Sequence, residues 1–490
     1  MASNQNFINS LLTKFYRVMY FYCYLYNNVL TDEERKKQLN DFIMYKLMKD
    51  YGIKRKVIGD DIYLLSYNMN SELFNGKLTD SNMFVLLCKH FVIDMNSSAI
   101  LSLGNVKAYD QFENIDEFNA QFTGDFNDYS VEILEPGTMI IYNKQLSKEQ
   151  RLNDTDCDPT ISTRKKIGTS HFNFNNSFSD YFHKNNELIG FQEDKLDEGK
   201  CYVFNCKVPG EHLTLTPEFK NSLIDCYSFK SVEDSRATHL KLMDLLKTVS
   251  GDVELQTPED LGKVEGFEQL LNELVSNMVN VHDVNAETKA LQQTGAGMMN
   301  TPDRLQFHNL LELNDYIKYK EKNVEKGITI YNRDGRRVNY KYKLYSELEE
   351  LRGNLPLNID TETNHENLFK IYWKLASSGK CEKFFTYFDS REIYKNLFYQ
   401  FGKDMEQLSI SLFKTYHKAY VQKTLPKDKI YYYLKNLCYK LHGFYMENRK
   451  ENRITPEVTL EFIRNLDVNQ VYWRLYDVDR YTNTVVEPVD

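Results

Sequence analysis

The stretch Val131-Glu-Ile-Leu-Glu-Pro-Gly-Thr-Met-Ile-Ile-Tyr142 marks the beginning of a β-rich part of the sequence. Two runs of mainly apolar residues flank Glu135-Pro-Gly137, and a Pro-Gly pair is a strong turn signal. The stretch therefore predicts two strands joined by a turn. Comparable strand-like runs follow at residues 159–163, 201–208, 213–216, 327–331 and 337–345.

The sequence on both sides of these strands has the periodicity of helices. In residues 1–50, and again after Leu351, apolar residues recur every three or four positions, as they do on the buried face of an amphipathic helix. Residues 231–325 are also largely helical in pattern and partly loop-like. We therefore predict an α+β protein in which antiparallel sheets are flanked by helices.

The length of 490 residues is too great for one compact core and predicts two or three domains. We predict a mixed, mostly helical region at 1–128 and a β-rich domain at 129–350. This domain carries an acidic helical insertion at about 231–325. An all-helical domain is predicted at 351–490.

Charge is unevenly distributed along the chain. The net charge of −9 argues against a protein coated all over with basic groups for nucleic acid. Residues 231–290 hold 12 acidic and 5 basic side chains, whereas residues 389–453 hold 13 basic and 7 acidic ones. One part of the chain therefore repels phosphate, and another part can attract it.

The composition also predicts the cellular compartment and the role of the many aromatic residues. Eight cysteines form no Cys-x-x-Cys pair and no zinc-type spacing, so we predict free thiols, no disulfide and no structural zinc in an intracellular, cytoplasmic protein. The apolar stretch Val18–Leu30 is too short to span a bilayer and predicts a buried helix. The 35 tyrosines and 30 phenylalanines have codons rich in A and T, so most are expected to serve packing.

The order of the predicted elements resembles that of the phage-type RNA ligases, and most closely that of their relatives in large DNA viruses. The resemblance runs from about Val131 to Trp473 and depends on four local motifs. It implies a covalent nucleotidyltransferase core followed by a helical domain.

The first motif is Thr160-Ile-Ser-Thr-Arg-Lys-Lys-Ile-Gly-Thr-Ser170. It looks like the strand that carries the nucleophilic lysine of the family, which lies in a Lys-x-Asp-Gly pattern. The resemblance implies that Lys166 is the nucleophile. Gly168 stands at the position of the aspartate.

The second motif is Cys201-Tyr-Val-Phe-Asn-Cys-Lys-Val-Pro-Gly-Glu-His-Leu-Thr-Leu215. It resembles the family strand that reads roughly Tyr-x-Phe-Glu, followed by a proline turn. Phe204 and Pro209 are kept, and the resemblance places Phe204 and Asn205 against the nucleotide. Asn205 replaces the catalytic glutamate.

The third motif is Val324-Glu-Lys-Gly-Ile-Thr-Ile330, which resembles the strand that supplies a metal-associated glutamate. Aligned on Gly327, the glutamate position holds Lys326, and Glu325 lies one residue early. Glu265, in Glu265-Gly-Phe267, is a rival match that has no strand after it.

The fourth motif is Asn339-Tyr-Lys-Tyr-Lys-Leu-Tyr345, followed by Leu351-Arg352-Gly353-Asn354. In the family a Lys-x-Lys strand contacts the nucleotide phosphate, so the resemblance implies this role for Lys341 and Lys343. Leu-Arg-Gly-Asn opens the helical domain of the family and is the most specific short match in the chain.

The implied chemistry joins RNA ends through a lysyl-AMP formed from ATP with Mg²⁺. The attacking lysine must be neutral, so its pKa must fall from about 10.4, and neighbouring cations supply that shift. Arg164 and Lys165 lie beside Lys166 in sequence, and Lys341 and Lys343 would lie nearby in the fold. We therefore expect Lys166 and Lys343 to face a shared cleft.

The sequence keeps the cations of this site and loses its carboxylates, at Gly168, Asn205 and Lys326. A site of lysines can still bind phosphate, but it should hold Mg²⁺ poorly because Mg²⁺ requires oxygen ligands. In an active enzyme, Glu325 or Glu265 would have to serve the metal.

Three functions are therefore left open. The first is a pseudo-enzyme that binds RNA, another nucleic acid or a protein. The second is an active ATP-dependent RNA ligase, and the third is a structural component of a viral particle or replication compartment, located in the host cytoplasm or the virion. Aromatic residues interleaved with cations at 340–345 suit stacking on single-stranded RNA, and the acidic insertion suits the docking of a protein.

Overall fold

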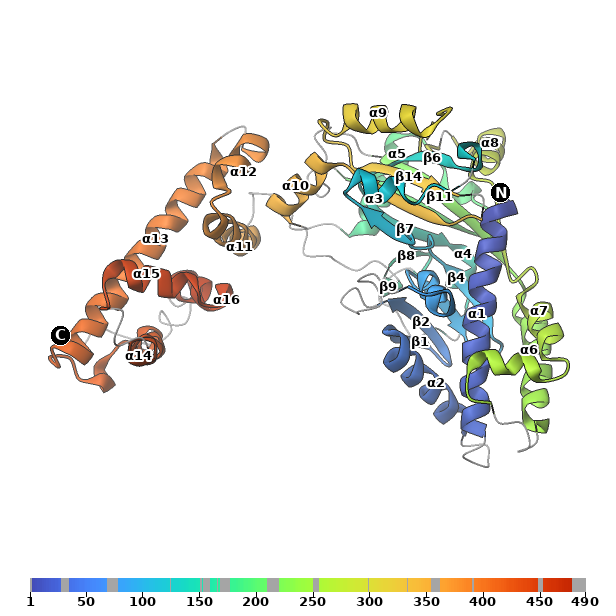
Figure 1. Ribbon diagram of the computed structural model, residues 1–490, viewed down its shortest axis with the longest axis horizontal. Helices are drawn as coiled ribbons and strands as arrows, with labels where there is room; N and C mark the ends of the chain where they lie inside the picture. Colours follow the sequence, from blue (N-terminus) through green and yellow to red (C-terminus); the bar gives the residue numbers. More distant parts are fainter. Residues whose placement is uncertain are drawn as a thin grey trace. The chain divides into compact units, whose positions relative to one another are not determined.

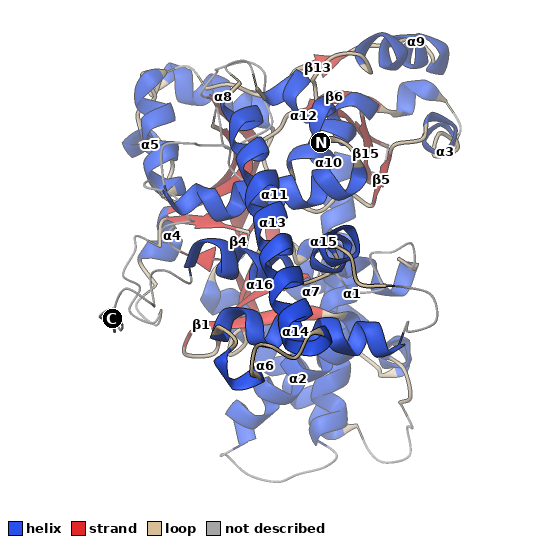
Figure 2. Ribbon diagram, turned by 90° about the vertical axis from the view of Figure 1, so that its left-hand side faces the viewer, coloured by secondary structure: helices blue, strands red, loops and turns tan. Residues whose placement is uncertain are grey.

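The structure is a computed structural model in which the chain forms two compact units, residues 1–346 and 347–490 (Figure 1). Every described strand lies in the first unit, and the second unit is helical (Figure 2). The residues described are 2–27, 35–67, 78–123, 125–149, 152, 159–164, 166–167, 177–208, 220–249, 255–297, 299–332, 334–353, 362–389, 392–447 and 453–477.

The first unit begins with two helices and a four-stranded antiparallel sheet. The helices are α1 (Ala2–Asn27) and α2 (Arg35–Tyr51). The sheet has the order β1-β2-β3-β4, and a 3₁₀ helix, η2 (Asp80–Leu87), lies between its second and third strands in sequence. The sequence predicted the helices but assigned no strand here. The strands are β1 (Ile53–Gly59), β2 (Ile62–Tyr67), β3 (Phe91–Asp94) and β4 (Ala99–Leu103).

Two further sheets form the middle of the first unit. The six-stranded sheet has the order β12-β11-β10-β7-β8-β9 and is antiparallel. Its strands are β7 (Thr138–Asn143), β8 (Ile161–Thr163), β9 (Lys166–Ile167), β10 (Lys200–Lys207), β11 (Lys220–Phe229) and β12 (Val279–Val281).

The five-stranded sheet has the order β13-β6-β14-β15-β5, and only its β5–β15 pair is parallel. Its strands are β5 (Asp110–Phe112), β6 (Ser130–Leu134), β13 (Arg304–Leu305), β14 (Gly327–Tyr331) and β15 (Arg337–Lys341). The predicted strands on either side of Glu135-Pro-Gly137 are thus confirmed as β6 and β7. They belong to different sheets, so the turn carries the chain from one sheet to the other.

Helices cover these sheets (Figure 1). The segment predicted as an acidic insertion supplies helices and also β12 and β13, one strand for each large sheet. One apolar cluster joins residues of α1, η2, the N-terminal sheet, β10, α6 and α7, so residues 1–128 and 129–346 do not separate into two compact units. The helices are α3 (Ile115–Asn119), α4 (Lys144–Ser147), α5 (Phe178–Leu188), α6 (Val232–Thr248), α7 (Phe267–Val275), α8 (Val284–Gln293) and α9 (Leu310–Lys320).

The boundary between the two units falls within α10 (Lys343–Arg352). The sequence predicted a strand over 337–345, and this prediction is wrong at its end, because β15 stops at Lys341. Tyr345, Leu348 and Leu351 are buried at three-residue spacing, which is the spacing of a helix face. The second unit continues with α11 (Glu362–Ser378), α12 (Cys381–Phe388), α13 (Ile393–Tyr416), α14 (Tyr432–Glu447), α15 (Pro456–Arg464) and α16 (Val468–Tyr472).

The loop after α8 packs closely against the rest of the first unit. The backbone N–H of Gln192 donates to the carbonyl of Ala296 at 2.8 Å, and Ala296 is fully buried. Gly297 follows with φ +97°, and a Cβ at this position would lie 2.6 Å from the carbonyl oxygen of Gly190. Gly295 has φ +79° with no atom within 4 Å of such a Cβ.

We predict that Gly297→Ala destabilises the protein more than Gly295→Ala does. Both substitutions force a side chain into a left-handed conformation, at a cost of about 1–2 kcal/mol. Gly297→Ala also drives a Cβ into backbone atoms, which typically adds about 1–3 kcal/mol. Chemical denaturation of the two variants measures the difference, and equal free energies of unfolding would contradict the close packing of this loop.

Candidate nucleic-acid interface

Lys166 lies on β9, at the edge of the six-stranded sheet, and is partly buried. It pairs with Thr163, and its neighbour Ile167 packs against apolar residues of the N-terminal sheet such as Ile58 and Val92. The short hairpin of β8 and β9 therefore packs against the N-terminal sheet. Lys165 and Gly168, which belong to the same motif, lie outside the described residues.

Phe204 and Asn205 are neighbours on β10 with different surroundings. Phe204 is fully buried in an aromatic cluster, with its ring 5.0 Å from that of Phe182. Asn205 donates from Nδ2 to the carbonyl of Pro136 at 3.1 Å, so its side chain holds the turn between β6 and β7.

A carboxylate that sequence reasoning missed lies in the same turn. Glu135 forms an ion pair with Lys220 at 2.6 Å and accepts a hydrogen bond from Ser222 at 2.7 Å. Both partners lie on β11. β11 pairs with β10, and Ser222 is the residue opposite Asn205 in this pairing. The position of Glu135 in the Glu135-Pro-Gly137 turn, at the start of the β-rich region, could have indicated it as a candidate site residue.

The lysines of the fourth motif lie in different elements. Lys341 is the last residue of β15 and is only 9% exposed, with Nζ 3.8 Å from a carboxylate oxygen of Glu113. Lys343 is exposed at the start of α10. Tyr340, Tyr342 and Tyr345 are buried, so the aromatic residues expected to stack on RNA are part of the core.

The remaining predicted residues are distributed over both units. Glu325 pairs with Lys320 at 2.6 Å, and Glu265 is exposed just before α7. In the second unit, Arg352 is buried at the end of α10 and Gly353 follows with φ +67°, as helix ends commonly require. Asn354 lies outside the described residues.

Five cations converge between the N-terminal sheet and the two larger sheets. We call this set, Lys89, Lys107, Arg164, Lys326 and Arg337, the core basic cluster. They come from five separate segments, and each is partly exposed. Tyr67 lies among them, with Arg164 5.4 Å and Lys107 5.7 Å from its ring centre.

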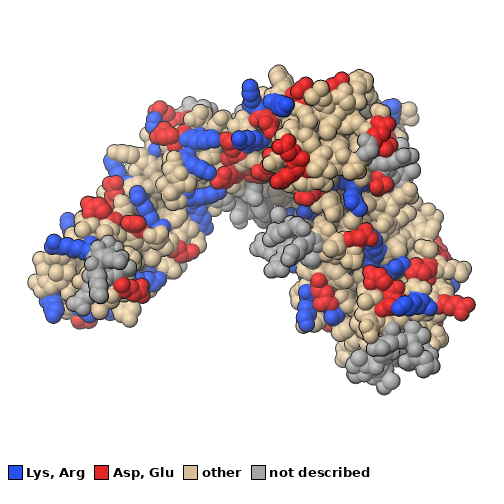
Figure 3. Space-filling view, viewed as in Figure 1, with Lys and Arg blue, Asp and Glu red and all other residues tan. Residues whose placement is uncertain are grey.

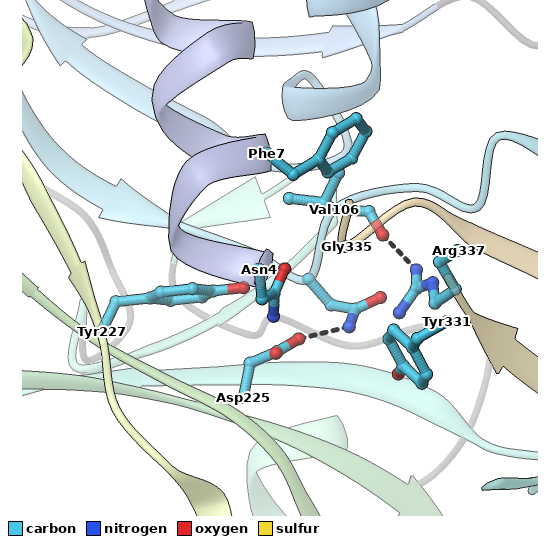
Figure 4. Close-up of a pocket in the computed structure, with 9 residues that line it drawn as sticks. Asn4, Phe7, Val106, Asp225, Tyr227, Tyr331, Gly335 and Arg337 are labelled. Carbon is cyan, nitrogen blue, oxygen red and sulfur yellow. Dashed lines mark hydrogen bonds between the residues drawn. The ribbon is translucent and has the colours of Figure 1, made fainter. Parts of the chain in front are cut away.

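Hydrogen bonds tie the cluster to one buried carboxylate. Lys89 donates to Oδ1 of Asn105 at 3.4 Å, and Asn105 donates to Asp225. Arg337 donates to the carbonyl of Val106 (Figure 4). A cavity of about 20 Å³, enough for a single water molecule, is lined by Asn105, Asp225 and Arg337 among others.

The charges of the cluster shift the pKa values of Lys89 and Asp225. Burial, with the neighbouring Arg337, Lys326 and Arg164 cations, lowers the pKa of Lys89 to about 7, although Asp225 acts in the opposite direction. Burial raises the pKa of Asp225, while Arg337 and the hydrogen bond from Asn105 lower it. Asp225 thus attracts the charged form of Lys89, while the neighbouring cations repel it.

A second basic region lies in the C-terminal unit, between the end of α13 and the middle of α14. Residues 414–440 hold seven lysines and a single acidic residue, Asp428. All seven are exposed, and in the described part of the chain none pairs with a carboxylate. They are Lys414, Lys418, Lys423, Lys427, Lys429, Lys435 and Lys440.

Exposed tyrosines lie among these lysines. Tyr431 is 72% exposed and Tyr439 is 73% exposed, although large aromatic side chains are usually buried. Along α14, Tyr432, Lys435 and Tyr439 lie on one face, because residues three, four and seven apart share a face of a helix. We call the seven lysines together with Tyr431, Tyr432 and Tyr439 the aromatic–basic surface.

The buried side of the same segment holds this surface in place. Leu434, Leu437 and Leu441 are buried on the opposite face of α14, as the helical periodicity of the sequence after Leu351 predicts. The rings of Tyr420 and Tyr416 stack with their centres 5.1 Å apart. Nζ of Lys427 lies 4.4 Å from the centre of the Tyr420 ring. Figure 3 shows lysine and arginine side chains spread over the visible face of this unit, with residues of other kinds between them.

Comparisons with known proteins find similarity to solved structures. No family model matches the chain, and no curated protein matches it significantly. A predicted ATP-dependent DNA ligase from Aquifex aeolicus matches with a TM-score of 0.36 and 10% identity, over 76% of this chain and 80% of that one. A TM-score below 0.5 does not establish a common fold. Among the helices that the structure describes, none has the length and apolar character needed to cross a membrane.

Proposed function

We propose that this protein binds single-stranded nucleic acid through the aromatic–basic surface, on a nucleotidyltransferase-like chain that no longer forms lysyl-AMP efficiently. The observation that carries the proposal is that residues 414–440 combine exposed tyrosines with exposed lysines that have no carboxylate partner among the described residues. Single-stranded nucleic acid offers both a phosphate backbone and bases with flat faces. Proteins that bind it combine a positive surface with aromatic side chains on which bases stack.

The charge of this surface favours a nucleic acid over a protein partner. Seven lysines and one aspartate give residues 414–440 a net charge of about +6, while the whole chain carries −9. Lysine is depleted in the centres of protein interfaces, whereas lysine contacts with phosphates supply most of the affinity for nucleic acid. RNA is the class that the resemblance to RNA ligases suggests, and a protein partner for the acidic segment 231–325 stays a separate proposal.

The loss of efficient adenylation rests on the groups at the motif positions. Asn205 presents a neutral amide where the family has a glutamate. This amide donates a hydrogen bond to the carbonyl of Pro136 in the turn between β6 and β7. Glu325, the carboxylate available near the third motif, is paired with Lys320. A Mg²⁺ site built from these positions would need Glu325 to leave its lysine.

We predict that Tyr431→Ala combined with Tyr439→Ala weakens the binding of a fluorescein-labelled single-stranded RNA at least tenfold. Each stacked base contributes about 1–3 kcal/mol, and about 1.4 kcal/mol corresponds to a factor of ten in Kd. Fluorescence anisotropy at several salt concentrations measures both the affinity and its salt dependence.

Tyr319→Ala is the matched control, because Tyr319 is 72% exposed on α9 of the first unit. This control should bind RNA as the unaltered protein does. Equal affinities of all three proteins, or an affinity that does not fall with salt, would contradict the proposed interface.

We also predict that incubation with labelled ATP and Mg²⁺ gives little or no covalent adenylate. Loss of one group that stabilises the transition state typically reduces the rate by about 10²–10³, and more than one carboxylate is replaced here. Denaturing electrophoresis detects the labelled protein. Strong labelling that disappears in Lys166→Ala but persists in Lys322→Ala, an exposed lysine between α9 and β14, would instead establish an active ligase.

A further inference from the structure

His442 extends the aromatic–basic surface along α14. It lies seven residues after Lys435 and three after Tyr439, and residues at these spacings share a face of a helix. Its side chain is partly exposed, unlike the buried leucines of the same helix. Among the side chains of this face, the imidazole is the one whose charge changes near neutral pH.

A π-helical turn at the end of α13 forms the support against which His442 lies. This turn, η6 (His417–Val421), is closed by the backbone N–H of Gln422, which donates to the carbonyl of His417 at 2.8 Å. The rings of Tyr416 and Tyr420 lie nearly parallel there, with an angle of 11° between their planes. Single π turns are frequent at functional sites.

The chain then reverses and returns to the same tyrosine. Lys423 has φ +57°, a left-handed conformation that commonly ends a helix. The backbone N–H of Thr424 donates back to the carbonyl of Lys418 at 2.9 Å. The reversed segment places Nζ of Lys427 4.4 Å from the centre of the Tyr420 ring.

His442 borders the same ring as Lys427. Its ring centre lies 4.4 Å from that of Tyr420, and its Nδ1 lies 3.2 Å from Oη of Tyr416. Within the described ranges Nε2 makes no hydrogen bond, and it is not fully enclosed. One nitrogen of the imidazole is thus fixed by Tyr416, and the other is available to a ligand beside the Lys427 ammonium.

We propose that His442 and Lys427 together bind one phosphate of the single-stranded nucleic acid, and that His442 takes up a proton when it does. The inference rests on the proposed function and adds to it a phosphate contact whose strength depends on pH. The proton passes from water or buffer to the imidazole, and no covalent bond forms. In the charged ring Nδ1–H donates to Oη of Tyr416, and Nε2–H donates to a phosphate oxygen.

The groups that face His442 determine the sign of the effect. Burial and the Lys427 cation hold the pKa of His442 below its usual range in the unliganded protein. Burial raises the pKa values of Tyr416, Tyr420 and Cys438, so these neighbours stay neutral near pH 7. The ring of Tyr445 stacks beside the imidazole from the same helix. A bound phosphate attracts the charged imidazole and raises its pKa, so the affinity for nucleic acid increases as the pH falls.

An oligouridylate RNA is the probe for the test, because uracil neither gains nor loses a proton between pH 6 and pH 8. At equal ionic strength we expect binding to be about threefold to tenfold tighter at pH 6 than at pH 8, as one charge-assisted contact typically contributes. Fluorescence anisotropy measures both affinities. Isothermal titration calorimetry at pH 6 in two buffers of different ionisation enthalpy gives the number of protons taken up, which we expect to be a fraction of one.

Substitution at position 442 separates the effect of the charge from that of the shape. His442→Gln should remove the pH dependence and bind at pH 6 only as tightly as the unaltered protein does at pH 8. His442→Arg places a permanent charge on a planar group that can stack on Tyr420, so its binding at pH 8 should reach that of the unaltered protein at pH 6. His417→Gln is the matched control, because the His417 ring lies beside Phe413 on the π turn, and it should keep the pH dependence.

The outcomes distinguish this inference from the proposed function. RNA binding that falls with salt, but is equal at pH 6 and pH 8 or changes equally in His442→Gln, would overturn the inference and leave the proposed interface standing. No binding of the RNA at either pH would overturn both. If His442→Gln does not fold, the proton count on the unaltered protein still decides the question, and zero uptake at pH 6 would overturn the inference.

Discussion

The burial of α1 is the constraint on which the first unit depends. Its apolar residues, such as Leu11, Phe15 and Tyr20, are fully buried and contact η2, α6 and α7. Tyr20 also binds the ring nitrogen of His239 at 2.9 Å, and Arg17 pairs with Glu268 at 2.8 Å, so polar groups fix how α6 and α7 lie on this helix. Each fully buried apolar side chain contributes roughly 1.5–3 kcal/mol. α1 therefore supplies a large part of the core that the N-terminal sheet shares with the acidic helices.

This shared core explains why a cationic site can exist inside an acidic protein. The core that includes α1 also joins the N-terminal sheet to β10 and β11. Lys89 lies near Arg164 and Arg337 in the same unit. The cations around Lys89 lower its pKa, and Asp225 acts in the opposite direction. The aromatic–basic surface differs from this cluster, because its lysines are fully solvated and their repulsion is screened by salt.

The sequence predicted the elements well where local patterns decide them. The strands around Glu135-Pro-Gly137, the Gly327–Tyr331 strand and the stripe of Leu434, Leu437 and Leu441 all follow from periodicity. It predicted least where distant segments meet. Neither the placement of β6 and β7 in different sheets nor the convergence of cations on Lys89 leaves a local signal. The tyrosines show the same limit, since composition cannot tell the buried Tyr340 from the exposed Tyr439.

The most direct test of the central claim is to locate bound nucleic acid on the protein. Ultraviolet crosslinking of the full chain to a single-stranded RNA, followed by mass spectrometry of the crosslinked peptides, reports which aromatic residues lie against bases. The account predicts crosslinks in peptides that contain Tyr431, Tyr432 or Tyr439, which decrease as salt is added. Crosslinks confined to the first unit, or an absence of crosslinking at an RNA concentration that saturates binding, would contradict it.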